Sequence, residues 1–237
     1  MNVRQAKLLA AIIDQFIETA LPVGSNELLR QSNDFQLSGA TIRNEMRVLG
    51  EEGFLEQPHI SAGRIPTAKG YRVYVKEFMQ PSQTELKVRK KFDVLKEQYF
   101  RRKDQERVYE AVALLSHMMS NIAFATVPHK ERVYYLGLAN VMRQPEFQSN
   151  PLMATGVVEV LESRITDFLA HIEIDDHVRY YIGDEHLLPQ MQSCSVLLTR
   201  YKLRDEPGVI GIIGPMRMDY AYNTAALELV CDLLRHS

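Results

Sequence analysis

Cysteine is scarce in this chain: only Cys194 and Cys231 occur among its 237 residues. Their separation matches no zinc-ligand spacing, and two cysteines in a chain of this length do not make the disulfide framework of a small secreted domain. We therefore expect two free thiols and a reducing, cytoplasmic location.

Long apolar runs are absent as well. A membrane helix needs about 20 consecutive apolar residues, whereas the longest early stretch, Leu8 to Ile13, ends at Asp14. The first residues also lack the basic, apolar and small-residue regions of a secretory signal. We expect no membrane partner. The 46% of residues that are hydrophobic suffice for a packed core without disulfides, metal or cofactor.

Neither sign of charge prevails, because the formal net charge is −2. Residues 81–110 carry nine Lys/Arg against six Asp/Glu, and residues 111–237 carry ten against fifteen. Residues 57–76 contain no acid and four basic side chains: Arg64, Lys69, Arg72 and Lys76. A local basic strip is expected where a protein meets phosphates. Taken alone, the strip fits an ordinary solvated surface equally well.

Helical periodicity marks the first part of the chain. Apolar residues over 3–20 recur at the spacing of a helix with one buried face, and Pro22 follows its end. A short second helix is predicted to begin at Ser25. A third is predicted to begin after the N-cap residue Ser38 and to end near Gly53.

The pattern changes after the third helix. Phe54 and Leu55 begin an extended segment, residues 59–66 form a turn-rich loop, and Tyr71–Val75 suits either a return strand or the start of a helix. Three short helices, an extended segment, a loop and a return predict a winged helix-turn-helix domain over residues 1–80 that binds double-stranded DNA.

The third helix of such a domain lies in the major groove with its N-terminal residues at the base edges. With its apolar residues turned inward, five polar side chains remain on its surface: Ser38, Thr41, Arg43, Asn44 and Arg47. Arginine can bind guanine, asparagine can bind adenine, and hydroxyls can bind phosphate. Any amphipathic helix carries such residues, but the basic, glycine-containing loop that follows favours DNA, because a wing must approach the duplex closely.

Residues 81–126 are predicted to form a helical connector, with helical periodicity to about Ile122 and a basic break at Arg101–Lys103. It could join the DNA-binding part to the rest or contribute to a dimer interface. Beyond it, strands are predicted at 132–138, 178–182, 194–203 and 208–213, and helices at 152–169 and 218–235. Gly208–Gly214 is apolar enough for a central buried strand. The fold class is therefore α+β, with a small antiparallel or mixed sheet.

Enzyme chemistry finds little support. Metal-ligand residue types cluster between His171 and His177, together with Glu173, Asp175 and Asp176. Their spacing matches no metal motif, and a turn explains the adjacent aspartates more simply. The glycines of 208–214 lie three apart within a strand and cannot open a helix as a dinucleotide loop does. No Ser/His/Asp or Cys/His arrangement can be assigned, so we expect no catalytic residue, no metal and no enzyme.

Several blocks of sequence form a specific pattern. They are Leu37–Met46, Glu51–His59, Ser61–Thr67, Lys69–Arg72 and Tyr74–Val75 in the first third, and Gln144–Phe147, Gly211–Pro215 and Arg217–Tyr220 later in the chain. Together they resemble the HrcA family of heat-inducible transcription repressors. The resemblance therefore runs through most of the chain. A match of this length is far more specific than a generic helix-turn-helix pattern.

The resemblance implies a homodimeric negative regulator of heat-shock operons of the groE and dnaK type. It would bind an inverted-repeat operator, CIRCE, and its activity would be maintained by the GroEL chaperonin. A two-fold operator requires a two-fold protein, because each recognition helix reads one half-site. We expect the DNA-binding residues to be the five of the third helix together with His59, Ser61, Arg64, Thr67, Lys69 and Arg72.

The chain also departs from the family pattern. Members usually carry a fuller GAF-like domain that is interrupted by an inserted dimerising domain. Here Thr126–Pro128 passes almost directly to Arg132–Leu136. We therefore expect a shortened GAF-like regulatory and dimerisation domain over residues 127–237. Ile60 stands where the family commonly has threonine, which removes one hydroxyl from the predicted wing.

Two other functions stay open on the sequence. GAF-like domains often bind small ligands, so the chain could be a ligand-responsive winged-helix transcriptional regulator. The winged helix could also dock a protein. Salt dependence separates DNA from protein, because each phosphate contact steepens the fall of log affinity with log salt by roughly 0.9.

Overall fold

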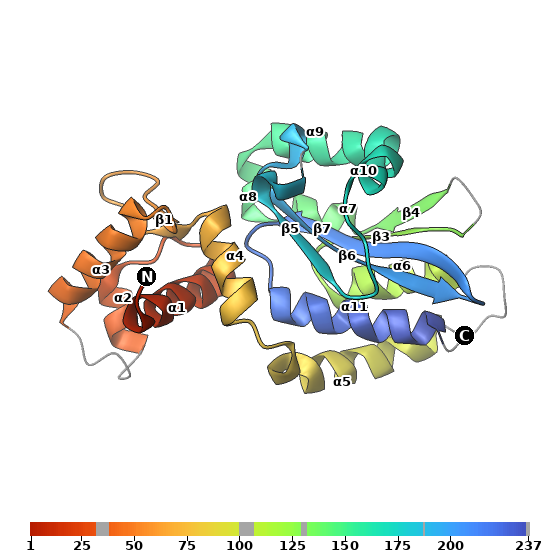
Figure 1. Ribbon diagram of the computed structural model, residues 1–237, viewed down its shortest axis with the longest axis horizontal. Helices are drawn as coiled ribbons and strands as arrows, with labels where there is room; N and C mark the ends of the chain where they lie inside the picture. Colours follow the sequence, from red (N-terminus) through yellow and green to blue (C-terminus); the bar gives the residue numbers. More distant parts are fainter. Residues whose placement is uncertain (32–37, 100–106, 129–131, 187, 236–237) are drawn as a thin grey trace. The chain divides into compact units, whose positions relative to one another are not determined.

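The computed structural model describes residues 1–31, 38–99, 107–128, 132–186 and 188–235. The chain divides into two compact units, Met1–Met79 and Gln80–Ser237, and each is described by itself (Figure 1). Among the described helices, none combines the length and apolar character that crossing a bilayer requires.

The described residues of the first unit form four helices and a two-stranded sheet. Its elements are α1 (Val3–Thr19), α2 (Ser25–Gln31), α3 (Gly39–Glu51), β1 (Leu55–Glu56), β2 (Ile65–Pro66) and α4 (Ala68–Glu77). β1 and β2 pair antiparallel, with Leu55 opposite Pro66. The three predicted helices are present. For Tyr71–Val75, where the sequence left a strand and a helix open, the structure has the helix α4.

Local side-chain hydrogen bonds cap the start of α1, α3 and α4, and the cap at Ser38 is the one that the sequence predicts. Asn2 and Gln5 form a reciprocal capping box at the start of α1. The Oγ of Ser38 accepts a hydrogen bond from the backbone N of Thr41 at 3.2 Å and so caps α3. Thr67 caps α4 in the same way, which is why the chain turns into a helix there.

Apolar residues from three helices form the core of the first unit. The fully or almost fully buried ones are Leu8, Leu9, Ile12 and Ile13 of α1, Ile42 and Leu49 of α3, and Tyr71 of α4. Their spacing within each helix is the 3.6-residue period that predicted one buried face. Burial of these side chains fixes α3 against α1, and α3 carries four of the predicted DNA-binding residues: Thr41, Arg43, Asn44 and Arg47.

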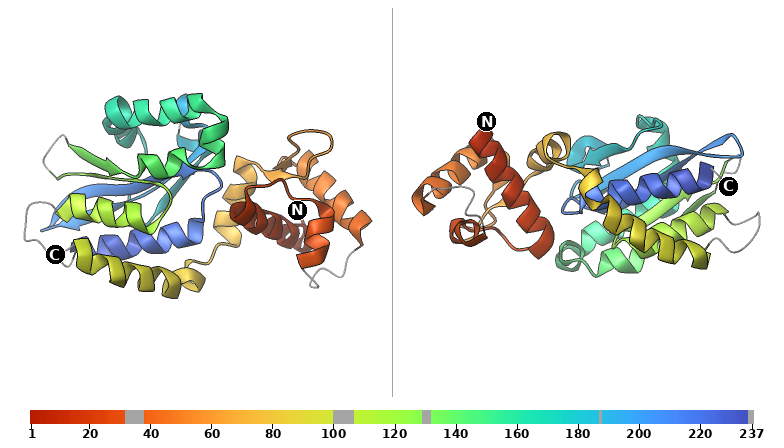
Figure 2. Two further views of the ribbon diagram at one scale, coloured as in Figure 1. Left: turned by 180° about the vertical axis from the view of Figure 1, so that it is seen from behind. Right: turned by 90° about the horizontal axis from the view of Figure 1, so that it is seen from below.

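The second unit is a five-stranded sheet with helices on both faces (Figures 1 and 2). Its strands are β3 (Ile122–Thr126), β4 (Val133–Leu136), β5 (Arg179–Ile182), β6 (Cys194–Leu203) and β7 (Glu206–Pro215). Its helices are α5 (Pro81–Tyr99), α6 (Arg107–Met118), α7 (Leu138–Met142), α8 (Pro145–Ser149), α9 (Pro151–Glu159), a π-helical turn (Val160–Arg164), α10 (Ile165–His171), 3₁₀ turns at Gly183–His186 and Pro189–Met191, and α11 (Tyr220–Arg235).

The strand order is β4-β3-β7-β6-β5, and every neighbouring pair is antiparallel. β7 occupies the centre, which confirms the prediction of a central buried strand at Gly208–Gly214. β6 and β7 form a hairpin whose two turn residues, Arg204 and Asp205, have φ of 53° and 67°. Such left-handed pairs match the twist of the flanking strands. A Cβ on Gly211 would lie 2.6 Å from the carbonyl oxygen of Leu197, so this strand position requires glycine.

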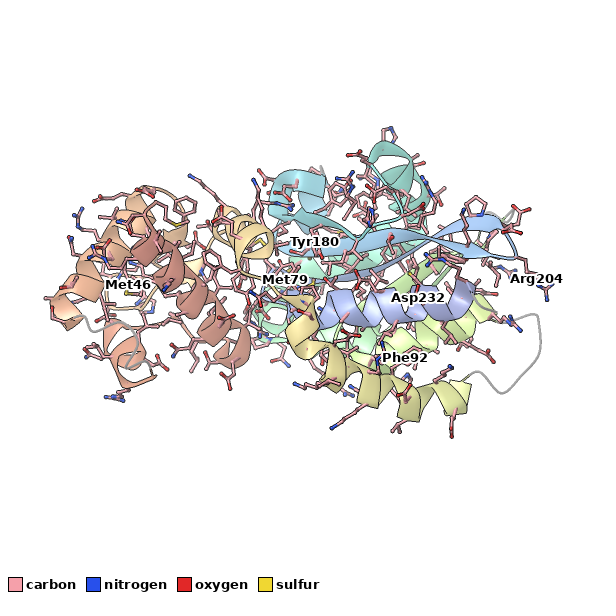
Figure 3. All side chains as sticks on the ribbon, turned by 60° about the horizontal axis from the view of Figure 1, so that its bottom comes forward. Met46, Met79, Phe92, Tyr180, Arg204 and Asp232 are labelled. Carbon is pink, nitrogen blue, oxygen red and sulfur yellow. The ribbon has the colours of Figure 1, made fainter. Side chains whose placement is uncertain are left out.

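Each face of the sheet has its own helical cover. On one face, Phe124, Val196 and Ile213 pack in a single core cluster with Val157 of α9 and Phe168 of α10. On the other face, α6 and α11 lie against the strands, and α5 packs on α11. Figure 3 shows Phe92 between α5 and α11, where it is buried.

The expected helical connector over residues 81–126 differs from the structure. α5, α6 and β3 all belong to the second unit, and β3 supplies an inner strand of its sheet. Ile122 begins a strand, although its apolar spacing continued the helical pattern. Most of the last residues of α6 and most residues of β3 are buried and apolar. The spacing of apolar residues therefore does not show where the helix ends and the strand begins. The predicted break at Arg101–Lys103 lies outside the described residues.

Candidate nucleic-acid interface

The exposed face of α3 carries the polar side chains that the sequence singled out. Arg43, Asn44 and Arg47 are exposed and Thr41 is half-buried. The hydroxyls of Ser38 and Thr41 are 2.9 Å apart at the N-terminus of the helix. Three of these residues, Arg43, Asn44 and Arg47, are therefore exposed donors, whereas Ser38 and Thr41 are engaged at the N-terminal cap of the helix.

Arg47 is held by its own helix. Its Nη2 donates to Oδ1 of Asn44 at 3.2 Å, and its guanidinium forms an ion pair with Glu51 one turn later. Because both partners are exposed, this pair is weak and easily exchanged for a phosphate or a base. Arg43 makes no hydrogen bond or ion pair with the described residues.

A groove of about 460 Å³ joins α3 to the loop between β1 and β2. The loop, residues 57–64, is called the β1–β2 loop below. The groove brings together four of the predicted DNA-binding residues: Arg43, Arg47, Ser61 and Arg64. The described residues that line the groove include three arginines and no Asp or Glu, although Arg47 pairs with Glu51 outside the lining. The groove is therefore a site of concentrated positive charge in a unit with no net charge.

The β1–β2 loop is closed by a glutamine that the sequence analysis missed. Nε2 of Gln57 donates to the carbonyl oxygens of Ile60 and Ala62, both at 2.9 Å. Within the loop, Nδ1 of His59 lies 3.2 Å from Oγ of Ser61. Polar side chains often hydrogen-bond nearby backbone groups in turns. Which backbone groups Gln57 contacts cannot be read from the sequence.

The base of the β1–β2 loop is anchored to the segment between α1 and α2. Val23 and Arg64 exchange two backbone hydrogen bonds of 2.9 Å each. A Cβ on Gly63 would lie 2.4 Å from the carbonyl oxygen of Val23. The side chain of Arg64 packs over Gly50 of α3, with Nη1 3.3 Å from where a Cβ would stand. Arg64 thus lies between the loop and the helix, half-buried.

Thr67, Lys69 and Arg72 do not line the groove, and the first two have structural contacts instead. Oγ1 of Thr67 donates to the carbonyl oxygen of Gly53 at 2.7 Å and accepts from the backbone N of Gly70. Nζ of Lys69 donates to the carbonyl oxygen of Glu52 at 2.7 Å and stands over the ring of Phe54. These bonds satisfy the carbonyl end of α3. Arg72 is half-buried on α4 and does not line the groove.

A buried carboxylate sets the position of α3 and was also missed. Glu45 lies on the inner face of α3, 5% exposed, and pairs with Arg4 and with Nε2 of Gln5 on α1, the latter at 2.8 Å. Its spacing from Ile42 and Leu49 placed it on the apolar face, which was the available signal. Buried carboxylates need such partners, so this contact ties α3 to α1.

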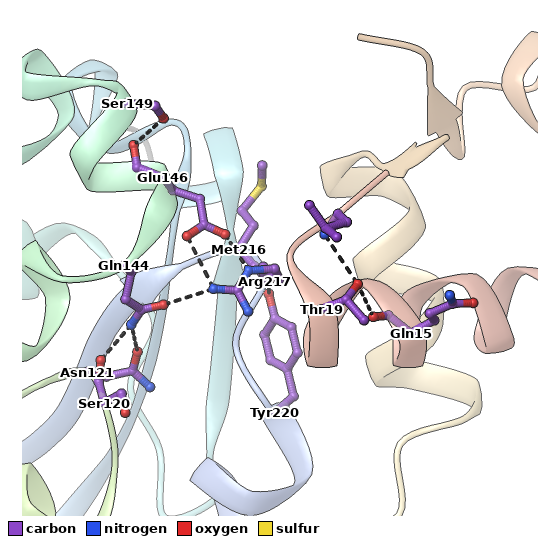
Figure 4. A network of polar contacts seen from close by, with 11 residues as sticks. Gln15, Thr19, Ser120, Asn121, Gln144, Glu146, Ser149, Met216, Arg217 and Tyr220 are labelled. Carbon is purple, nitrogen blue, oxygen red and sulfur yellow. Dashed lines mark hydrogen bonds and ion pairs between the residues drawn. The ribbon is translucent and has the colours of Figure 1, made fainter. Parts of the chain in front are cut away.

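In the second unit, two blocks of the family resemblance meet. Arg217 forms an ion pair with Glu146 at 2.5 Å and a hydrogen bond with Gln144 at 3.4 Å (Figure 4). Gln144 in turn donates to the carbonyl oxygen of Ser120 and to Oδ1 of Asn121. The network joins the end of β7 to the chain before β3 and before α8.

The candidate metal-ligand cluster is an ion-pair cluster instead. Arg179 pairs with Glu173 at 3.0 Å and with Asp175 at 2.6 Å. The backbone N of His177 donates to Asp175 and, together with Arg179, holds the pKa of that carboxyl below its ordinary value. Within the described ranges, no group of three or more His, Cys, Asp or Glu side chains could hold a metal ion.

Both cysteines are buried, free thiols. Burial raises the pKa of Cys194 and of Cys231 to about 12. Their thiols are therefore protonated at neutral pH, and protonated thiols are poor nucleophiles and poor metal ligands.

Comparison with known proteins gives a family match over most of the second unit. The family model described as "HrcA protein C terminal domain" matches residues 77–222. A heat-inducible transcription repressor HrcA of Gloeobacter violaceus is 45% identical, over 99% of this chain and 93% of that relative. One from Brevibacillus brevis is 29% identical, with 92% of each chain covered.

The alignment with the Gloeobacter violaceus relative spans 338 positions, more than the 237 residues of this chain. The additional residues of the relative therefore lie within the matched range, and the shortening is internal. Among solved structures, a crystal structure described only as that of a hypothetical protein has a TM-score of 0.81 and 19% identity. It covers 100% of this chain, with 97% of its own chain covered, and it supports the fold alone.

Proposed function

Because the chain belongs to the HrcA family, we propose that it is a heat-inducible transcription repressor that binds operator DNA through its first unit. The curated relatives are repressors and not enzymes. The single observation that carries the DNA-binding role to named residues is the groove between α3 and the β1–β2 loop.

In this proposal the first unit is a winged helix-turn-helix. α3 is the recognition helix and the β1–β2 loop is the wing. Arg43 and Asn44 contact base edges, because both are exposed on the outer face of α3. Arg64 contacts phosphate from between the helix and the wing. Arg47, Ser61 and His59 complete the contacts, while Thr67 and Lys69 support the end of α3.

We further propose, from the family resemblance, that the operator is the inverted repeat CIRCE and that the chain binds it as a homodimer in the cytoplasm. An inverted repeat presents the same half-site twice, so two copies related by a two-fold axis bind it best. The second unit, a shortened GAF-like domain in this proposal, carries the regulatory and dimer contacts. GroEL maintains the active form.

The proposal is tested by footprinting the purified chain on the chaperone promoters of its own genome, with and without GroEL. Protection of an inverted repeat, with two half-sites about one helical turn or a multiple apart, is the expected result. GroEL should raise the active fraction, seen as protection at lower repressor concentration. If none of these promoters shows a protected inverted repeat when GroEL is present, the operator assignment is contradicted.

A second candidate function has an observation in its favour. The second unit has a groove of about 590 Å³ between α5, α6 and α7, a size common among small-molecule sites. Lys91, His117 and Asn140 are among the residues that line it. Burial and the neighbouring Lys87 lower the pKa of Lys91. A ligand-responsive regulator would bind a small anion here. Operator affinity that changes with a metabolite and not with GroEL would favour this function.

A further inference from the structure

Ile60 lies in the β1–β2 loop and is 100% exposed. The loop projects beyond the helices of its unit in Figure 1 and in the left view of Figure 2. A single exposed apolar residue is ordinary on a protein surface, so exposure alone assigns no role. The hydrogen bonds that order the loop and the positive charge near it indicate what Ile60 contacts.

The backbone around Ile60 is fixed before any partner binds. Gln57 bonds the carbonyl oxygens of Ile60 and Ala62, and the backbone N of Ala62 donates to the carbonyl oxygen of His59 at 2.8 Å. Because these bonds already order the loop, presenting Ile60 to a partner costs little further conformational entropy.

The base of the loop gives this tip a firm support. Val23 and Arg64 hold the returning strand through two backbone hydrogen bonds. Gly63 fits so closely against Val23 that no side chain could stand between them. The loop is therefore held rigidly against the rest of the first unit. Such rigidity is needed if a side chain at its tip is to be inserted between stacked bases.

The surroundings of Ile60 indicate the chemistry of its partner. His59 and Ser61 flank it, and Arg64 and Arg43 line the groove that the same loop helps to form. An apolar tip beside concentrated positive charge fits a surface that is anionic outside and apolar within. Duplex DNA has this character, with phosphates outside and stacked bases inside. Isoleucine is among the side chains that wedge between base pairs from the minor groove.

Resting on the proposed function, we infer that Ile60 inserts between two base pairs from the minor groove and kinks the operator. Pyrimidine–purine steps, TA and CA/TG, unstack most readily. Ile60 would therefore add selectivity for a deformable step in each half-site, whereas Arg43 and Asn44 select base edges. It is a specificity-determining residue that acts through DNA shape.

The test uses the full chain and a CIRCE duplex with a fluorescent donor and acceptor at its two ends. Binding of the wild-type protein should raise energy transfer, because a kink brings the ends together. Ile60→Ala should abolish that rise and weaken binding about tenfold, the effect of losing most of one buried apolar side chain. The salt slope should not change, because no phosphate contact is lost. Ile60→Met should keep the kink.

Val3→Ala is the matched control, because Val3 is an exposed apolar residue of the same unit, 76% accessible. It should bind and bend DNA as the wild type does. In a second duplex, the TA and CA/TG steps of the footprint are replaced by AA, and there wild type and Ile60→Ala should differ much less.

A straight wild-type complex would overturn the wedge, and so would an Ile60→Ala variant that bends and binds as the wild type does. Either result leaves operator binding by the wild-type protein intact. Failure of the wild-type protein to bind the duplex at all would refute the proposed function itself, so the two failures are distinguishable.

Discussion

Three arginines line the groove of the first unit, and the structure holds each of them differently. Arg47 is paired with Glu51 on its own helix, and Arg64 is half-buried over Gly50. Arg43 is exposed on the outer face of α3. Side chains with different freedom serve different contacts. A mobile arginine can adapt to a base edge, whereas a positioned one presents a fixed charge to phosphate.

Arg43→Ala and Asn44→Ala should each cost about 1–3 kcal/mol on the operator, because bidentate base contacts have that value. Binding to a shuffled duplex of the same composition should change much less. The measurement is the ratio of the two affinities. Arg235→Ala, which removes an exposed arginine paired with Asp232 in the second unit, is the control. Unchanged operator discrimination in both variants would exclude them from base contact.

Arg64→Ala should weaken binding to all duplexes to a similar degree and reduce the salt slope by about one, because one phosphate contact is lost. Arg64→Lys keeps the charge but loses the planar group that packs over Gly50. It should therefore keep most of the slope. Affinity titrated against salt concentration measures both. A slope in Arg64→Ala equal to that of the wild type would remove Arg64 from the phosphate contacts.

At the scale of the element, the β1–β2 loop depends on how closely it approaches the body of its unit. Gly63 and Gly24 lie on either side of the Val23–Arg64 bridge, yet their surroundings differ. A Cβ on Gly63 would overlap the backbone of Val23, whereas one on Gly24 would meet nothing within 4 Å. The two glycines therefore provide a matched pair for testing the placement of the loop.

Gly63→Ala should destabilise the first unit by about 1–3 kcal/mol, the usual cost of overpacking, and should weaken DNA binding by displacing the loop. Gly24→Ala should change neither stability nor binding appreciably. Thermal unfolding and operator titration measure the two effects. Equal behaviour of the two variants would show that the loop is not positioned by this contact.

The elements differ in how far the sequence could predict them. The N-cap of α3 and the buried strand at Gly208–Gly214 were predictable, because capping and apolar character are local properties. Tyr71–Val75 is helical because Thr67 caps α4 by accepting from the backbone N of Gly70. This cap is also local, but the prediction for Tyr71–Val75 rested on its aromatic and β-branched residues, which suit a strand equally well. The spacing of residues 81–126 indicates helices but not what they pack against, because α5 and α6 contact α11 at the other end of the chain.

The candidate site was predictable in its residue types and less so in its geometry. Arg43, Arg47, Ser61 and Arg64 line one groove, which their types alone do not indicate. Gln57 was missed because its role is defined by two backbone carbonyls. Lys69 looked like part of a basic strip, but its ammonium group contacts the end of α3. Charge counts cannot distinguish these uses of a lysine.

At the scale of the whole molecule, each unit has its own core and its own hydrogen-bonded sheet. The Arg217–Glu146 network and the five-stranded sheet lie wholly within the second unit. The proposed dimer contacts also lie there. The two units should therefore separate in function as well as in fold, with DNA contact in one and assembly in the other.

Gln80–Ser237 expressed alone should fold and form a dimer, whereas Met1–Met79 alone should be a folded monomer that binds DNA weakly. The physical reason is that each unit closes around its own buried residues, so neither leaves a half-formed core. Circular dichroism and sedimentation measure folding and mass. Sedimentation of folded Gln80–Ser237 as a monomer would place the dimer contact elsewhere.

The central strand of the larger sheet arrives late in the order of synthesis. β7 lies between β3 and β6, so the two halves of the sheet stay unjoined until residues 206–215 have left the ribosome, whereas the first unit closes within 79 residues. Long-range strand pairing is slow and leaves apolar edges uncovered meanwhile. We therefore expect the second unit to need folding assistance more than the first. Under the proposed function, the amount of active repressor would then depend on how much chaperone is free to assist the folding of the second unit.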